Sequence, residues 1–124
     1  MMETDFLTQK VIGCAIEVHK NLGPGLLELS YESCLMYELN KAGLIAKRQA
    51  IQSINYKDMQ IDAGYRLDIL LPEQLIIELK SVERLASIHT AQILTYLKLS
   101  KINTGLLINF NVEKLINGLK RISI

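Results

Sequence analysis

The chain has no tryptophan, only two prolines and two cysteines, and no apolar run near the roughly 20 residues that a membrane helix needs. Residues 1–5 are acidic, unlike the basic start of a secretory signal. Cys14 and Cys34 lie in helical patterns without metal-ligand spacing, which is typical of reduced, packed thiols. We therefore expect a soluble, cytoplasmic protein that does not bind membranes.

The length and composition predict a single domain over residues 1–124. The 124 residues include 49% hydrophobic and 22% charged residues, which suffices for one buried core. The net charge of +1 argues against indiscriminate tight binding to nucleic acid. Residues 63–124 carry eight basic and five acidic side chains, so the second half is the expected polyanion-facing part.

Apolar spacing and breaker residues predict the secondary structure. Helical periodicity indicates a helix over 5–21, followed by the breaker Gly23-Pro24-Gly25, and a second helix from the first turn at Glu28 to an exit at Gly43. The later expected elements are a strand over 44–56, a second strand that follows the turn at 57–58 and ends with residues 65–71, a strand over 75–80, a helix over 86–100 and a strand over 105–110. Residues 114–124 fit either a last strand or an amphipathic tail.

These elements predict an α/β (α+β) fold. Three successive strands with polar turns at 57–58 and 72–74 form an antiparallel meander, and the helix over 86–100 is the usual crossover to a parallel strand. The expected architecture is a mixed central sheet flanked by helices.

Acidic and basic residues occur where these strands would normally be apolar. Glu78 and Lys80 are two apart on one strand and share a face. If the connection between the strands has three residues, Leu71 lies opposite Leu75, and Asp68 then lies opposite Glu78. The pattern predicts two carboxylates and an ammonium group at one site.

A hard divalent cation would offset the repulsion between these carboxylates. Mg²⁺ or Mn²⁺ takes oxygen ligands, which predicts Asp68, Glu78 and the main-chain carbonyl of Leu79 as its protein ligands. Lys80 would then lie where negative charge develops during phosphodiester hydrolysis. We expect it to position water or stabilise that charge.

Each signal alone also has a plainer interpretation. Glu78-x-Lys80 is typical of an exposed strand end, and Glu28 of a carboxylate at a helix start. Gln92 and Tyr96 fit a half-exposed helix face, on which His89 is a candidate phosphate contact. The combination favours a divalent-metal site for phosphodiester chemistry.

The motifs resemble those of the GxxExxY proteins, a branch of the PD-(D/E)xK nuclease superfamily. The matching segments follow one another along nearly the whole chain: LGP at 22–24, GLLELSY at 25–31, GYRLD at 64–68, IELKSVE at 77–83, HTAQILTYL at 89–97 and GLLINF at 105–110. The resemblance implies a restriction-endonuclease-like core of a helix, three antiparallel strands, a second helix and a fourth strand.

The resemblance also implies roles for individual residues. Asp68 and Glu78 become the main metal ligands, Glu28 an outer or direct ligand, and Lys80 the catalytic lysine. Gln92 and Tyr96 match a Gln-x-x-x-Tyr motif that supports the substrate or the active-site network.

The leading hypothesis is a Mg²⁺- or Mn²⁺-dependent nuclease that acts on DNA rather than RNA. An alternative is a non-catalytic nucleic-acid-binding or assembly module with a structural cation site. A third is a small interaction protein that dimerises through its first helix and C-terminal segment. Because no specificity domain is evident, substrate choice is expected to come from a homodimer, a protein partner or nucleic-acid shape.

Overall fold

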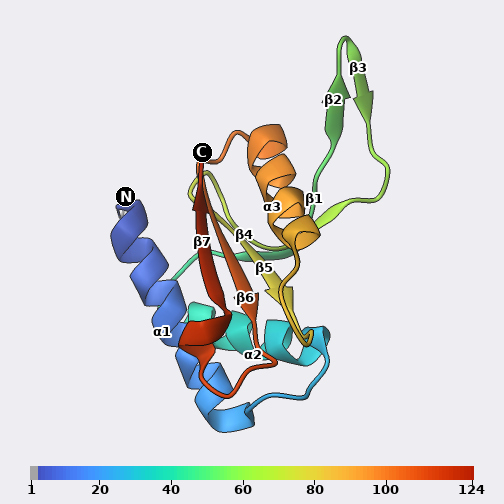
Figure 1. Cartoon of the computed structure of the whole chain (residues 1–124). Helices are drawn as coiled ribbons and strands as arrows, with labels where there is room; N and C mark the ends of the chain where they lie inside the picture. Colours follow the sequence, from blue (N-terminus) through green and yellow to red (C-terminus); the bar gives the residue numbers. More distant parts are fainter. Residues whose placement is uncertain (1–2) are drawn as a thin grey trace.

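The computed structural model describes residues 3–124, which form three helices and two β-sheets (Figure 1). In chain order the elements are α1 (Thr4–Leu22), α2 (Glu28–Lys41), β1 (Lys47–Ile51), β2 (Ile54–Tyr56), β3 (Met59–Ile61), β4 (Arg66–Leu71), β5 (Leu75–Lys80), α3 (Ser87–Ser100), β6 (Thr104–Asn109), a 3-10 turn (Leu115–Gly118) and β7 (Leu119–Ser123). The helix boundaries agree with the sequence prediction to within one residue at α1 and α3.

The main sheet has five strands in the order β1-β4-β5-β6-β7. β1, β4 and β5 pair antiparallel, and α3 provides the crossover to β6, which pairs parallel with β5. β7 pairs antiparallel with β6, so the segment 114–124 forms a 3-10 turn followed by a last strand and is not a tail. The predicted mixed α/β sheet is confirmed.

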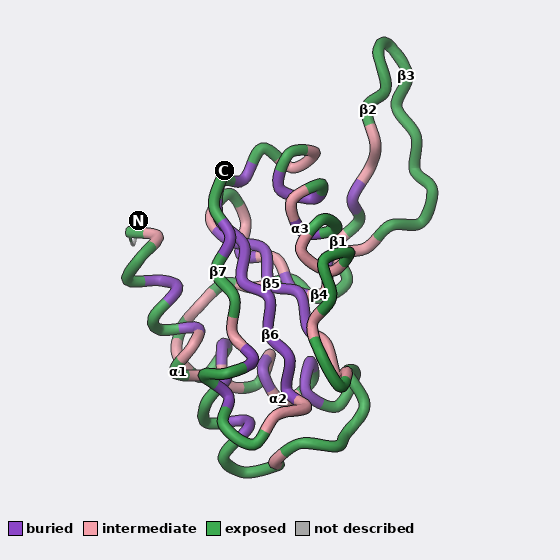
Figure 2. The backbone as a smooth tube through the Cα atoms, viewed as in Figure 1, coloured by how far each residue is buried: buried purple, intermediate pink, exposed green. Residues whose placement is uncertain are grey.

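Helices cover both faces of this sheet. Ile77 and Leu79 pack with α1 and α2 on one face, whereas Ile76 packs with α3 on the other. The apolar sequences of β5 and β6 reflect this double burial (Figure 2). Gly105 in β6 lets α3 pack closely, because a Cβ atom there would lie 2.8 Å from Cδ1 of Ile93 and would displace that side chain.

The prediction of one strand over 44–56 is wrong. β1 ends at Ile51, and the Lys57–Asp58 turn closes a separate hairpin of β2 and β3 that projects beyond α3 (Figure 1). Residues 52–53 separate β1 from β2, and residues 62–65 separate β3 from β4. Between these two connections, the Gln52 amide donates to the Tyr65 carbonyl at 3.0 Å. Because neither face of the hairpin is covered, its residues stay largely exposed.

Neither a membrane-spanning helix nor a disulfide is found within residues 3–124. Over residues 3–124, each helix is too short or too polar to cross a bilayer. Cys14 and Cys34 are free, half-buried thiols.

Candidate functional site

The β4–β5 pair ends in two interlocked acids. The predicted register of Leu71 opposite Leu75 is confirmed, and regular pairing continues to Ile69 opposite Ile77. At the next position the Asp68 amide donates to Oε2 of Glu78 at 2.8 Å, and the Leu79 amide donates to Oδ2 of Asp68 at 2.8 Å. Side-chain carboxylates therefore take the place of main-chain carbonyls as acceptors at this end of the ladder.

The strands are distorted beside Asp68. Leu67 and Leu70 both pack on the α3 side of the sheet although they are three residues apart, so the strict alternation of β4 is broken between them. In the neighbouring β1, Gln49 is skipped in the pairing and has φ of 51°, a left-handed conformation that is uncommon for a residue other than glycine. Backbone strain of this kind often clusters at functional sites.

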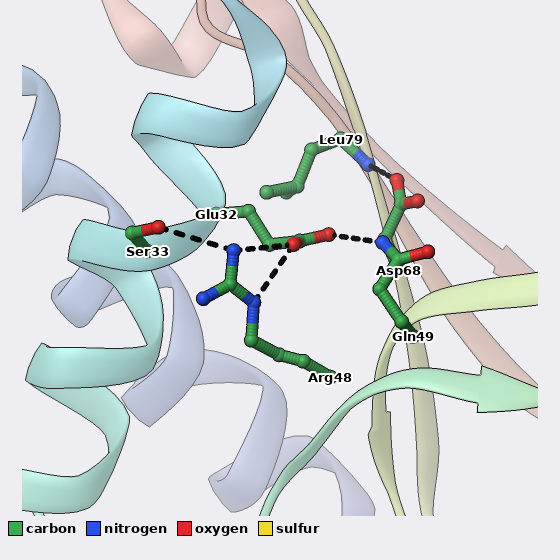
Figure 3. A network of polar contacts seen from close by, with 6 residues as sticks. All are labelled: Glu32, Ser33, Arg48, Gln49, Asp68 and Leu79. Atoms are coloured by element: carbon green, nitrogen blue, oxygen red, sulfur yellow. Dashed lines mark hydrogen bonds and ion pairs between the residues drawn. The ribbon is translucent and has the colours of Figure 1, made fainter.

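This strained conformation accompanies a contact to Glu32, an acid that the sequence analysis did not identify. Glu32 lies on α2 and is only 3% exposed. Its Oε1 accepts a hydrogen bond from Nε2 of Gln49 at 2.7 Å, and its Oε2 pairs with Nη2 of Arg48 at 2.8 Å (Figure 3). Its helical spacing from the buried Leu35 and Leu39 was the available signal, since positions three and seven apart share a face.

Burial and mutual repulsion disfavour ionisation of the acidic pair. Burial, together with the charge of Asp68, raises the pKa of Glu78 to about 8. Burial also raises the pKa of Asp68, and the charge of Glu32 adds to both effects while that of Lys80 opposes them. This environment favours the protonated form of Glu78, and a cation that replaces the proton would relieve the repulsion.

Glu28 approaches the same strand end from α2. It is exposed in the first turn of that helix, and its Oε2 accepts a hydrogen bond from the Ser81 amide at 3.2 Å. The Ser81 hydroxyl also donates to the Leu26 carbonyl at 2.6 Å. Glu28 is thus bound to the residue that follows Lys80 in the chain. The charge of Glu28 contributes to the raised pKa of Asp68.

Two buried side chains fix the loops around this strand end. The Tyr31 hydroxyl donates to the Gly23 carbonyl at 2.6 Å and accepts from the Leu26 amide at 3.1 Å, which holds the entry to α2. Asn109 accepts from the Val82 amide at 3.1 Å and donates to the Val82 carbonyl at 2.9 Å. Both contacts restrict the chain segments that carry Glu28 and Lys80.

An open cavity of about 490 Å³ lies beside Lys80. It brings Lys80 together with the other residues expected to support the site, namely His89, Gln92 and Tyr96 of α3. Ile54, the first residue of β2, and Tyr65, in the connection between β3 and β4, contribute to its lining. The rings of Tyr65 and Tyr96 meet edge to face, with centroids 6.5 Å apart. Tyr65 is a second residue whose contribution the sequence analysis did not anticipate.

The donor set fits a hard divalent cation held by few protein ligands. Within residues 3–124, no three side chains of His, Cys, Asp or Glu gather closely enough to form a metal cluster of their own. Asp68 and Glu78 each use one carboxyl oxygen in the interlocking bonds, so the second oxygen of each is a candidate ligand. Mg²⁺ commonly binds through one or two carboxylates and completes its shell with water and substrate phosphate.

The chain also matches a model of a known protein family. The family model described as the PD-(D/E)XK nuclease superfamily matches residues 5–122. This range includes all helices and strands apart from Thr4 and Ser123, and every site residue named above. Comparisons with curated proteins and with solved structures give no significant match. On the family match, the chain belongs to the PD-(D/E)XK nuclease superfamily.

Proposed function

We propose that this protein is a Mg²⁺- or Mn²⁺-dependent nuclease that hydrolyses phosphodiester bonds in DNA. The observation that carries the proposal is the interlocked pair of Asp68 and Glu78, with Lys80 two residues along the strand and bordering an open cavity. Superfamily membership supports nucleic acid as the substrate. The preference for DNA over RNA rests on the resemblance of the motifs.

The carboxylates and one carbonyl would bind the cation. Asp68, Glu78 and the main-chain carbonyl of Leu79 are the proposed inner ligands, and Glu28 is the proposed outer or direct ligand. When bound, a divalent cation would supply Lewis-acid polarisation of a phosphate oxygen. The buried setting of Glu78, 4% exposed, excludes water that would otherwise weaken these electrostatic interactions.

Lys80 is the proposed catalytic residue. Its ammonium group would orient the attacking water and stabilise the negative charge that develops on the phosphate oxygens. His89, Gln92 and Tyr96 line the cavity next to it, where they can contact the substrate strand. Catalysis in this proposal depends on placing these groups before the substrate arrives.

A cleavage assay with a matched lysine control tests the proposal. Linear duplex, circular duplex and single-stranded DNA would each be incubated with Mg²⁺, Mn²⁺, Ca²⁺ or EDTA. We expect cleavage with Mg²⁺ or Mn²⁺ and none with EDTA. Lys80→Ala should lower kcat by about 100-fold or more, whereas Lys98→Ala, an exposed change on α3, should leave cleavage unchanged.

Thermal melting separates catalysis from folding and metal binding. Lys80→Ala removes no ligand, so we expect Mn²⁺ to raise the melting temperatures of this variant and of the parent by the same amount. Undiminished cleavage by Lys80→Ala would refute the role of the lysine. A protein that binds DNA and Mn²⁺ but cleaves nothing would instead be the non-catalytic module with a structural cation site.

The same proposal places the protein in the cytoplasm. The free Cys14 and Cys34 fit a reducing compartment. Selection of the DNA substrate by a homodimer or a protein partner remains a prediction from the sequence.

A further inference from the structure

The cavity beside Lys80 contains an aromatic ring that the proposed chemistry does not use. Tyr65 is 45% exposed and lies in the connection between β3 and β4. It contacts Tyr96, which is only 7% exposed and is anchored in α3, through an edge-to-face pair. The packed ring therefore supports the exposed one, which leaves Tyr65 available to an incoming ligand.

The cavity also offers directional hydrogen-bonding groups. Nδ1 of His89 accepts a hydrogen bond from the Ala86 amide at 2.9 Å, so the proton of the neutral ring is on Nε2. That nitrogen is then a donor, and the Gln92 amide supplies both a donor and an acceptor. Ile54 and Ile88 add apolar surface. A mostly apolar cavity with a few polar groups is typical of a site that orients a planar ligand.

Its size and chemistry favour an unpaired nucleotide. The volume of about 490 Å³ falls within the usual range of small-ligand sites. A base inside a duplex is paired and stacked, so it cannot enter such a cavity unless it is extruded. An unpaired base can stack on a tyrosine, and this interaction tolerates any base.

We infer that the cavity binds an unpaired nucleotide of the substrate strand, with Tyr65 as the stacking platform next to Lys80. This inference deepens the proposed function and rests on it for the identity of the ligand as a substrate. It narrows the substrate class to single-stranded DNA or to single-stranded segments of a longer DNA.

Binding without metal tests the inference independently of cleavage. A single-stranded oligonucleotide carrying 2-aminopurine would be titrated with protein in EDTA, beside the same strand in a blunt duplex. We expect fluorescence quenching on the single strand and at least about tenfold weaker binding of the duplex. Tyr65→Ala should weaken single-strand binding about 5- to 100-fold and remove the quenching, whereas Tyr65→Phe should retain both.

Tyr56→Ala is the matched control. Tyr56 is 55% exposed on β2 and does not belong to the lining of the cavity, so its loss should leave binding unchanged. Thermal melts of each variant verify folding. The comparison of single strand with duplex uses the parent protein, so it tests the inference even if a variant fails to fold. Equal binding of single strand and blunt duplex by the parent, or unchanged single-strand binding by folded Tyr65→Ala, would overturn the inference.

The two proposals fail in different ways. Single-strand binding that depends on Tyr65, without cleavage of any DNA, would leave the cavity assignment standing and refute the nuclease. If the protein cleaved blunt duplex DNA and Tyr65→Ala did not alter that cleavage, the nuclease proposal would stand and the cavity assignment would be refuted.

Discussion

The two ends of the β4–β5 pair differ in how they are held together. At the turn end, Leu71 lies opposite Leu75 and Leu70 opposite Ile76, in a regular and largely buried apolar ladder. At the other end, Asp68 and Glu78 accept main-chain hydrogen bonds through their carboxyl groups. The same two strands therefore provide hydrophobic stability at one end and a concentration of unfavourable charge at the other.

The difference shows how the fold tolerates its acidic end. Burying a carboxylate costs free energy unless partners compensate. Here hydrogen bonds from the strands and the nearby charge of Lys80 offset part of that cost, while Glu32 is neutralised by Arg48. The adjacent apolar ladder of β4 and β5 holds the two acids in place, so the acidic end need not contribute to the stability of the fold.

Removing an apolar side chain from the ladder should have the largest effect on stability. Leu75 lies at the turn end and is fully buried, and Leu75→Ala should lower the free energy of unfolding by about 2–5 kcal/mol through lost burial and a cavity. Urea denaturation of the metal-free protein measures it. A loss below about 1 kcal/mol would mean that the turn end is not the stabilising end.

Glu32→Gln tests whether the partner shell supports the acidic end. It should cost about 1–3 kcal/mol, because Arg48 and Gln49 lose a charged acceptor. It should also lower the pH midpoint of Mn²⁺ binding, because a negative charge near Glu78 is removed. Glu38→Gln on the same helix is the control, and it should change neither the stability nor the pH midpoint. An unchanged midpoint in Glu32→Gln would show that Glu32 does not influence the acidic pair.

The raised pKa of Glu78 predicts opposite pH trends for folding and for metal binding. Its folded pKa of about 8 exceeds its ordinary value of 4.5, so this group stabilises the folded state most below pH 4.5 and progressively less as pH rises to 8. Cation binding must displace the proton, so Mn²⁺ affinity should rise by up to about tenfold per pH unit below pH 8.

Glu78→Gln supplies the contrast for these trends. It retains an acceptor for the Asp68 amide but cannot titrate, so the contribution of this group to the pH dependence of unfolding should vanish, and Mn²⁺ binding should weaken strongly. Calorimetry and denaturation at pH 6, 7 and 8 measure the two effects. Mn²⁺ affinity equal to that of the parent would show that Glu78 is not a ligand.

Glu28→Gln should have the smallest effect on stability. Glu28 is exposed and accepts one hydrogen bond, from Ser81, which the amide oxygen of glutamine can preserve, so unfolding should shift by less than about 0.5 kcal/mol. Mn²⁺ affinity or cleavage should fall if Glu28 is a ligand. The variant therefore separates a metal role from a structural one, and unchanged binding and cleavage together would exclude the former.

Local rules account for the parts of the site that the sequence predicted. The three-residue connection after Leu71 is a property of neighbouring residues, and it fixes the pairing as far as Ile69 opposite Ile77, beside which Asp68 and Glu78 lie. The split of the first strand was missed because residues 44–56 alternate loosely throughout. No local signal there distinguished a strand that stays in the sheet from one that leaves it.

The sequence by itself determined the order of the three helices and of strands β1, β4, β5 and β6, the pairing register of β4 with β5 and the acidic and basic residues at the strand ends, because periodicity and turn length act over a few residues. Only the tertiary structure decided that Glu32 is buried against Arg48 and Gln49, and that Tyr65 joins Lys80 and Tyr96 around one cavity. These contacts join residues separated by at least 15 positions. They depend on how α2, α3 and the hairpin pack on the sheet, which no local pattern specifies.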